Sequence, residues 1–436
     1  MSKPPGPAAW PLIGHLPAYL HDKLGFLTRC SERYGDVVRL RIGEPTYLLN
    51  DPTDIKHVLI DNGSNYNRTW RMTSPRGKRL WGNGMQTSSG GEHLRKRRMV
   101  QPAFSRRSIG VFLEAMTDRT QRRMERWSIE SQEVELAREM DSLALSIILG
   151  ALFGRDFDDD QVTRAIAIRR RYIEYVYGSL LPLPEFLPLP IVRDYRRAQH
   201  FIDEVIRHQA EHPSSSDSFA AMFAAAMQEG VQIDFAQLRD EILPMINTSE
   251  TMGAALCWTL YLLAGNPDAQ AAVVKELAQV LGDRDPSLDD IARLTYTRQV
   301  LDESLRLYPP NWILVRIAIG DDTLPGGTDI HRGNKLYLCQ YVTHRSRKYF
   351  PDPDRFDPSR FSPAETALRP EFAYFPFGGG RRRCIGEHFA LMEGVTVLAL
   401  LMRRFRFELS PDQSIIPAPA VTLRPKNGIR ARIFAC

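Results

Sequence analysis

Residues 377–386 read FGGGRRRCIG, a stretch rich in glycine and arginine that contains Cys384. Three consecutive glycines permit backbone conformations that other residues avoid, and they let a flat ligand approach closely. Cys384 follows three arginines and precedes a predicted helix, and both features favour the thiolate over the thiol. A lone thiolate here could ligate a haem iron, and the arginines could neutralise haem carboxylates. The alternative is a flexible basic turn with an incidental cysteine.

The cysteine count supports a solitary role for this thiol. Five cysteines are widely spaced and form no C-x-x-C pair, which argues against a disulfide scaffold and a structural zinc site. The chain also lacks an H-E-x-x-H zinc motif. The spacing suits a reducing compartment. The five residues are Cys30, Cys257, Cys339, Cys384 and Cys436.

Two acid-containing pairs could do chemistry or hold structure. Glu303 and Arg306 are three residues apart and share a helix face, where an exposed pair contributes only a few tenths of a kcal/mol. Glu250 and Thr251 place a carboxyl beside a hydroxyl, which is what proton delivery requires. The alternative for the second pair is a polar notch in a core helix, because a mid-helix threonine often bonds back to the preceding turn.

A basic helix start at 89–98 holds His93 and Arg97 four residues apart on one face. A shift of register by one residue would replace His93 with Leu94. We expect Arg95 and Lys96 on the solvated side.

Apolar periodicity predicts the elements that position these residues. A strand pair is expected at 37–42 and 46–49, a small sheet within 313–341, and a C-terminal hairpin that pairs 421–423 with 429–434. The 181–190 connection is rich in proline. A long helix is expected at 234–263 with Pro244 inside it, where the missing hydrogen bond should cause a kink. Further helices are predicted at 108–129, 134–153, 161–178, 192–211, 217–229, 297–307 and 387–404.

The composition is that of a folded protein. The chain has 436 residues, of which 43% are hydrophobic and 25% charged, and its net charge of +5 is too small and scattered to indicate nucleic-acid binding. The start has no signal-peptide core, and the apolar run at 252–265 is too short to span a membrane. We therefore expect one mainly α domain over 1–436 with a minor β region, and no membrane span.

The cysteine stretch resembles the haem-binding signature of the cytochrome P450 superfamily. The pattern matches at every fixed position: Phe377, Gly380, Arg382, Cys384 and Gly386. The resemblance, which extends along the whole chain, implies the family fold, with haem b buried between a long central helix and the cysteine-loop helix. It implies that Cys384 is the proximal thiolate, which favours O–O cleavage. Phe377 would pack beside it.

The other motifs take family roles by the same resemblance. Glu303, Arg306 and Arg360 would form a buried network that holds the loop. Arg382, His93, Arg97 and Arg316 would bind the haem propionates. Glu250 and Thr251 would steady dioxygen and relay protons. The chain departs from the family at Asn247 and Thr248, where small residues are usual, and at Met252 in place of a second threonine.

The resemblance implies a monooxygenase that uses O2 and NADPH-linked electrons from a separate ferredoxin or flavodoxin, attracted by arginines 381–383 and the basic helix start. The substrate would be a lipophilic terpenoid, polyketide or fatty acid of secondary metabolism, and the reaction hydroxylation, epoxidation, oxidative coupling or desaturation. The alternatives are a peroxide-dependent peroxygenase or isomerase and a non-catalytic haem sensor.

We expect a bacterial-type, cytoplasmic monomer, unless an anchor before the Pro-rich start was removed. Pocket candidates are the 66–88 loop, the 181–190 connection, Leu243, Asn247, Trp312, Ile313, Leu314 and the 420–422 turn with Val421.

Overall fold

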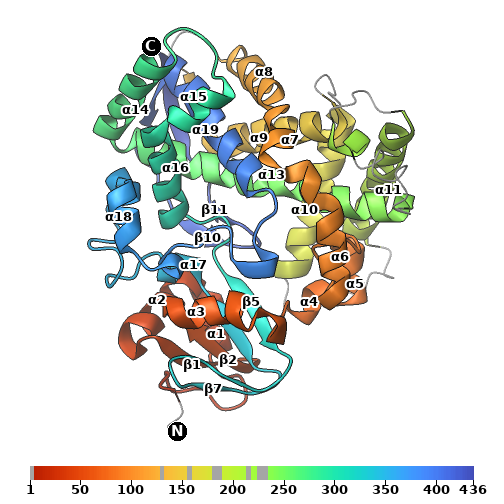
Figure 1. Ribbon diagram of the computed structural model, residues 1–436, viewed down its shortest axis with the longest axis vertical. Helices are drawn as coiled ribbons and strands as arrows, with labels where there is room; N and C mark the ends of the chain where they lie inside the picture. The colour runs from red at the N-terminus through yellow and green to blue at the C-terminus, as the bar shows by residue number, and fades with distance from the viewer. Residues whose placement is uncertain (1–3, 128–131, 155–159, 179–188, 213–217, 223–233) are drawn as a thin grey trace. The chain divides into compact units, whose positions relative to one another are not determined.

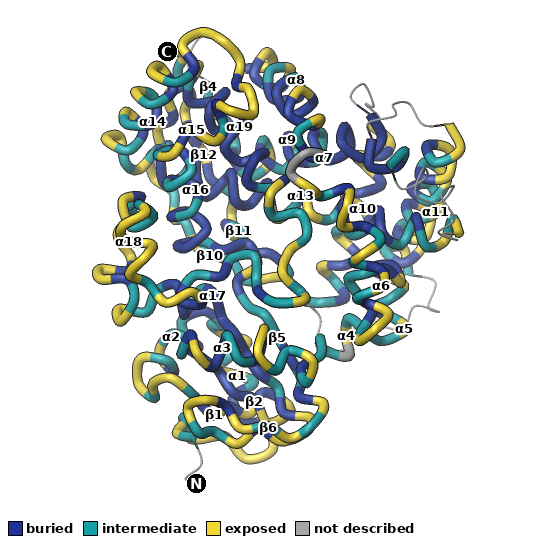
Figure 2. Tube along the Cα trace, in the orientation of Figure 1, coloured by how far each residue is buried: buried dark blue, intermediate teal, exposed yellow. Residues whose placement is uncertain are grey.

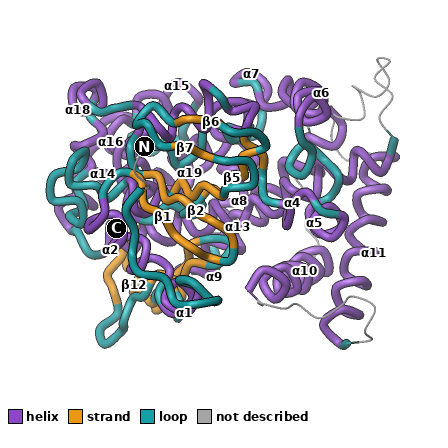
Figure 3. Tube along the Cα trace, turned by 90° about the horizontal axis from the view of Figure 1, so that it is seen from below, coloured by secondary structure: helices purple, strands orange, loops and turns teal. Residues whose placement is uncertain are grey.

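The computed structural model describes residues 4–127, 132–154, 160–178, 189–212, 218–222 and 234–436. The chain forms two compact units, one from Met1–Thr73 and Gln299–Cys384, the other from Ser74–Arg298 and Ile385–Cys436. Helices predominate and the strands form small sheets, which confirms the predicted fold class (Figures 1 and 3).

The first unit is built around a five-stranded sheet of order β1-β2-β8-β5-β3. β1 (Val37–Ile42) and β2 (Glu44–Leu49) are antiparallel, so the predicted strand pair is confirmed; the turn uses Gly43 at a φ of 77°. β8 (Lys335–Leu338) runs parallel to β2 and antiparallel to β5 (Leu314–Ala318), which confirms the small sheet. Further elements are β3 (Tyr66–Asn67), β6 (Asp322–Thr323), β7 (Asp329–Ile330), α1 (Leu16–His21), α2 (Lys23–Tyr34), α3 (Pro52–Lys56), α4 (Trp70–Thr73), α17 (Gln340–Thr343) and α18 (Pro363–Leu368).

One apolar core lies under this sheet and extends to the segment before the cysteine loop. It joins Leu49 and Leu338 of the strands to Phe372 and Phe375. The loop is therefore attached to a packed sheet.

The second unit is organised around α13 (Phe235–Ala264), which packs against α9 (Leu136–Phe153). Residues 252–263 are mostly apolar, and all of them except Tyr261 are buried, as in a helix enclosed by the core. The helix continues through Pro244. Helices around it are α5 (Pro75–Trp81), α6 (Gly90–Val100), α7 (Arg106–Gly110), α8 (Leu113–Met124), α10 (Asp160–Gly178), α11 (Pro190–Glu211), α14 (Pro267–Val280), α15 (Leu288–Arg293) and α19 (Glu387–Arg404); α16 (Thr295–Leu307) begins in this unit and ends in the first.

Three predicted segments differ from the structure or lie partly outside its described residues. The helix expected at 108–129 is instead two helices, α7 and α8, because the chain turns after Gly110, and glycine is a poor helix former. Only 218–222 of the helix expected at 217–229 is described, and residues 181–188 of the Pro-rich connection lie outside the described part.

The C-terminal hairpin prediction is wrong. β11 (Leu423–Pro425) pairs with β10 (Pro417–Pro419), whereas β12 (Arg430–Ala435) lies between β9 (Phe405–Leu409) and β4 (Gln132–Glu135). β12 alternates buried and exposed residues, and it pairs with a strand on each of its edges. β11 is a poor partner because it ends in Pro425, and proline has no N–H group to donate.

Figure 2 shows that buried residues fill the centre of both units and exposed ones lie at loop and helix surfaces. Among the described residues, no helix has the length and hydropathy that a membrane crossing needs.

Candidate active site

The cysteine loop is a compact turn in the first unit. The Cys384 N–H donates to the Phe377 carbonyl at 2.9 Å, and the Gly378 N–H donates to the Phe375 carbonyl at 2.9 Å. Cys384 itself is exposed, three residues before α19 begins at Glu387. The backbone therefore holds Cys384 at an exposed position at the end of the loop.

Two positions in the loop require glycine. Gly380 has a φ of 62°, and a Cβ there would lie 1.9 Å from the Leu59 carbonyl oxygen. A Cβ on Gly379 would lie 2.6 Å from the Phe372 ring. The glycines thus serve close packing of the loop on its own unit, in addition to the access for a flat ligand that the sequence suggested.

A cluster of cations lies beside the loop. Arg316, on β5, is buried, and burial lowers its pKa to about 9, with the charges of Arg68 and Arg382 adding to the effect. A buried cation whose like-charged neighbours lower its pKa favours an anion as a partner. These arginines therefore suit the propionates of a haem, and with the exposed thiol of Cys384 they fit that cofactor. Arg68 was not assigned to this role from the sequence, because it sits in a loop without a recognisable pattern.

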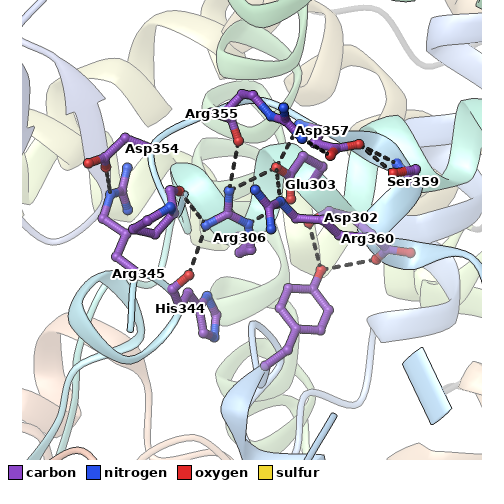
Figure 4. A network of polar contacts seen from close by, with 12 residues as sticks. Asp302, Glu303, Arg306, His344, Arg345, Asp354, Arg355, Asp357, Ser359 and Arg360 are labelled. Carbon is purple, nitrogen blue, oxygen red and sulfur yellow. Dashed lines mark hydrogen bonds and ion pairs between the residues drawn. The ribbon is translucent and has the colours of Figure 1, made fainter. Parts of the chain in front are cut away.

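Glu303 and Arg306 form a fully buried ion pair. Arg306 donates to the two carboxylate oxygens at 2.6 and 2.8 Å, and both side chains are inaccessible to solvent. Burial raises the pKa of Glu303, and the hydrogen bond from Arg306 opposes that rise. Arg360 Nε lies 3.6 Å from the same carboxylate. The structure brings together the three residues that the sequence grouped, as Figure 4 shows.

Backbone carbonyls occupy the remaining donors of Arg306. Its guanidinium donates to His344, Pro353 and Arg355 at 2.9, 2.7 and 3.3 Å, while the Asp357 N–H donates to Glu303 at 2.9 Å. The pair therefore fastens the 344–357 segment to α16.

His344 links this network to the cysteine loop. Arg306 binds its carbonyl, and its ring Nε2 accepts the Phe375 N–H at 3.0 Å. Burial and the neighbouring charge of Arg306 hold the pKa of His344 well below its usual value, so the ring is neutral and Nε2 can accept. The chain of contacts runs from Arg306 through His344 and Phe375 to Gly378. The role of His344 was not predicted from the sequence, because a single histidine between two elements gives no periodic signal.

In the second unit, Glu250 and Thr251 occupy the middle of α13. The Thr251 side chain is exposed, and its hydroxyl donates to the Thr248 carbonyl at 2.7 Å. The back-bonding that sequence analysis gave as an alternative is therefore present, but the oxygen keeps its lone pairs for an outside donor. Burial raises the pKa of Glu250, and the charges of Arg424 and Arg170 oppose the rise.

A charged cleft of about 300 Å³ lies next to Glu250. Arg170 lies 3.6 Å from the Glu250 carboxylate and 3.1 Å from Asp141, which also pairs with Arg424 at 2.6 Å. Asp141, Arg170 and Arg424 line the cleft. The carboxyl is therefore connected through charged groups to a cavity that water can enter.

Asn247 is held by a buried arginine. Arg169 Nη1 donates to Asn247 Oδ1 at 2.6 Å, and Arg169 also donates to Gln199 and to the Leu80 carbonyl. The unusual asparagine is thus part of a contact among α5, α10, α11 and α13. The neighbouring Thr248 is exposed.

On α6, the register that was expected for His93 places this side chain in a buried position, with Arg97 half-buried on the same face. Arg95 is exposed as expected. The expectation for Lys96 is wrong: it is buried, and it pairs with Glu92 at 2.7 Å and donates to the Asn83 carbonyl. Its long apolar stem makes such burial possible once the ammonium has partners.

The pocket candidates fall in both units. Leu243, Asn247 and Val421 belong to the second, while Trp312, Ile313 and Leu314 belong to the first. Leu243 and Trp312 are buried, and Leu314 would contact a Cβ on Gly378 at 3.4 Å, which places it beside the cysteine loop. Their joint role as a substrate pocket stays a prediction.

Known proteins resemble this chain along almost its full length. The family model described as Cytochrome P450 matches residues 4–430. Cyclooctatin synthase of Streptomyces melanosporofaciens is 32% identical over 96% of this chain and 92% of its own. Cyclooctat-9-en-7-ol 5-monooxygenase of the same organism is 30% identical, over 96% and 90%. Among solved structures, the haem domain of cytochrome P450DA matches with a TM-score of 0.86 at 24% identity, over 100% of this chain and 98% of its own.

Proposed function

This chain belongs to the cytochrome P450 family and is an oxidoreductase of the monooxygenase type, and from this premise we propose that it inserts oxygen into a terpenoid with electrons from a separate ferredoxin or flavodoxin. Membership implies a haem with a cysteine thiolate ligand, a redox partner, O2 and a lipophilic substrate. The particular haem, donor, substrate and reaction are our proposals.

The cofactor we propose is haem b, with Cys384 as its ligand. Arg316 and Arg382, with Arg68, would neutralise one edge of the haem from the first unit, and His93 and Arg97 are proposed to bind propionates from α6. Gly380 and Gly386 would allow close approach, and Phe377 would pack beside the sulfur. When bound, the haem supplies dioxygen activation and transfer of one oxygen atom to the substrate.

The observation that carries the proposal is the polar connection at α13. Thr251 presents an exposed hydroxyl oxygen, and Glu250 next to it reaches the charged cleft through Arg170 and Asp141. Because its pKa is raised, the Glu250 carboxyl can take a proton from the cleft nearer neutral pH than an ordinary glutamate. Dioxygen chemistry driven by an electron donor consumes protons, whereas a peroxide-dependent enzyme needs no such supply.

Glu303, Arg306 and Arg360 would act as positioning residues for the loop, through His344. We propose that the two units together form one haem-thiolate domain over 1–436, which works as a monomer in the cytoplasm. Exposed arginines at 95, 98, 381 and 383 are proposed to attract the acidic donor.

The terpenoid assignment rests on the relatives' names, cyclooctatin synthase among them, and on the apolar character of the candidate pocket. Hydroxylation is the reaction we favour; epoxidation, coupling and desaturation use the same oxidant.

The test is to assay the purified haem protein with a panel of cyclic terpenes. One set of reactions receives NADPH, ferredoxin and ferredoxin reductase, and the other receives hydrogen peroxide alone. Product that requires the donor supports the proposal. Product from peroxide alone would identify a peroxygenase or isomerase, and spectral ligand binding without any product would indicate a sensor. Cys384→Ser should lose the red-shifted carbon monoxide absorbance, and its retention would contradict the assigned ligand.

A further inference from the structure

A buried arginine and an asparagine in the second unit have no role in the chemistry proposed above. Arg169 lies on α10 and is 2% exposed, and Asn247 lies on α13 close to the buried Leu243 and Ile246 of the same helix. We name these two residues the α10–α13 pair. Polar side chains in apolar surroundings are costly unless their donors find acceptors, so the partners of this pair can be counted.

Arg169 has no counter-charge in contact with it. Its guanidinium donates to Asn247 Oδ1 at 2.6 Å, to Gln199 Oε1 at 2.9 Å and to the Leu80 carbonyl, all of which are neutral. Within the residues that the structure describes, no ion pair joins Arg169 to a carboxylate. Burial lowers the pKa of Arg169, and more distant carboxylates oppose that effect only in part. A buried cation without a paired anion is a costly group in a folded protein.

The α10–α13 pair keeps N–H donors that the described residues do not use. Three hydrogen bonds take up three of the five N–H groups of the Arg169 guanidinium. The same contact orients the amide of Asn247, because arginine can only donate and the atom that faces it must be the oxygen. Asn247 Nδ2 is buried and has no hydrogen-bond partner among the residues described. A cation and an amide therefore hold unused donors at one place.

This place is one helical turn from the pair that we propose for dioxygen chemistry. Asn247 and Thr251 are four residues apart on α13 and so share a face of the helix. The Nδ2 atom is enclosed, but Asn247 as a whole is half-buried, and both Thr248 and Thr251 are exposed. The unused donors therefore lie beside an accessible stretch of α13 that includes Thr251.

The chemistry of these donors favours an anion as their ligand. A carboxylate only accepts hydrogen bonds, and it supplies the negative charge that Arg169 lacks; charge-assisted hydrogen bonds are roughly twice as strong as neutral ones. Because folding has already buried Arg169, only the ligand must lose water when the two groups meet. A neutral ketone or alcohol would accept from Asn247 but would leave the cation without a counter-charge.

We propose that Arg169 and Asn247 form a carboxylate-binding site for the substrate, so that the enzyme oxidises a terpenoid acid rather than a terpene hydrocarbon. This inference rests on the proposed function, because it names the substrate class of the same oxidation. Arg169 pairs with the carboxylate, and Asn247 Nδ2 donates a further hydrogen bond to it. The apolar skeleton of the acid then lies along α13, near Thr251.

The test compares how acids and their methyl esters bind to the purified haem protein. The probes are farnesoic acid, dehydroabietic acid and the methyl ester of each, and the dissociation constants are measured by titration calorimetry. The wild type should bind each acid about tenfold or more tightly than its ester, because the ester cannot form the charge-assisted hydrogen bonds. Arg169→Gln should remove this preference.

Asn247→Asp is a second variant that tests the same site. It keeps an acceptor for Arg169 but replaces the Nδ2 donor with an internal carboxylate, so it should bind the acids no better than the esters. Arg171→Gln is the matched control, because Arg171 is exposed on the same helix, and it should keep the preference for acids. All variants should retain the wild-type carbon monoxide spectrum, which shows that they fold; if Arg169→Gln does not, Asn247→Asp decides the question.

Two results would overturn the carboxylate site and leave the terpenoid function standing. One is equal binding of acids and esters by the wild type, and the other is a preference for acids that survives in Asn247→Asp. If the wild type bound none of the four probes and none of the cyclic terpenes, the terpenoid substrate itself would be wrong, and the inference would fall with it.

Discussion

Arg169 and Asn247 form a hydrogen bond of 2.6 Å between α10 and α13. Arg169 is almost fully buried, and burial lowers its pKa. Arg169 donates hydrogen bonds to neutral oxygens of Asn247, Gln199 and Leu80. Asn247 is therefore one of the groups that stabilise a buried cation, which gives its amide a structural role.

Replacing Asn247 should destabilise the fold. Asn247→Ala removes an acceptor from a charged donor, so the free energy of unfolding should fall by about 1.5–3 kcal/mol. Thr248→Ala, at the exposed neighbour, should change it by less than about 0.5 kcal/mol. Urea denaturation of both variants checks this, and equal stabilities would mean that the contact with Arg169 contributes nothing.

The buried ion pair of α16 predicts a large effect of charge removal. Arg306→Met leaves Glu303 buried without its partner and should cost about 3–5 kcal/mol of unfolding free energy, with loss of bound haem. The double variant Glu303→Met with Arg306→Met should recover part of that loss, because no unpaired charge remains. Haem content per protein and urea denaturation are the measurements.

The control for this pair is Arg355→Gln. Arg355 is exposed and pairs with Asp357 at 2.6 Å, so its loss should cost less than about 1 kcal/mol. An effect of Arg306→Met on the free energy of unfolding as small as that of Arg355→Gln would contradict the stabilising role of the buried pair.

Gly380 should tolerate no side chain. Gly380→Ala brings its Cβ against the Leu59 carbonyl, so the loop must move and the carbon monoxide spectrum should shift from the thiolate form. Gly327 has a similar left-handed φ of 80° with nothing within 4 Å. Gly327→Ala should therefore cost about 1–2 kcal/mol of stability and leave the spectrum unchanged. A normal spectrum for Gly380→Ala would contradict the close packing.

Stability should depend on pH through Glu241. Burial raises the pKa of this carboxyl from 4.5 to about 7, although it accepts the Met85 N–H. The folded state therefore holds a proton that the unfolded state loses between these pKa values, so the free energy of unfolding falls as pH rises through this window. The fall should be about 2–3 kcal/mol between pH 5 and pH 8.

Glu241→Gln keeps the acceptor and removes the charge, so its unfolding free energy should vary less over the same pH range. Parallel pH profiles for variant and wild type, measured by urea denaturation, would show that Glu241 is not the titrating group.

Much of the fold followed from local patterns. The last helix was predicted at 387–404 and α19 has these bounds, because an apolar run that starts after a glycine and ends before a β-rich segment leaves little choice. The strand pair near residue 43 was equally clear from its turn. The partner of β12 was not, because pairing across distant segments leaves no trace in a short window.

In the candidate site, too, contacts between residues close in sequence were predicted, whereas contacts between distant residues were not. Glu303 and Arg306 were grouped from their spacing, and the structure places them in contact. The roles of Arg68 and His344 depend on neighbours from other elements, which no local motif encodes. Lys96 was placed on the wrong side because a basic run in a sequence does not show which member finds buried partners.

The network that supports the cysteine loop has a consequence for assembly. Its members, from Glu303 and Arg306 to Phe375 and Gly378, all come from one stretch of chain, so closing these contacts carries a modest loop entropy. We therefore expect the newly made polypeptide to shape the thiol-bearing turn from nearby residues while the porphyrin is still in solution. The haem iron would then bind to a thiol whose loop is already folded.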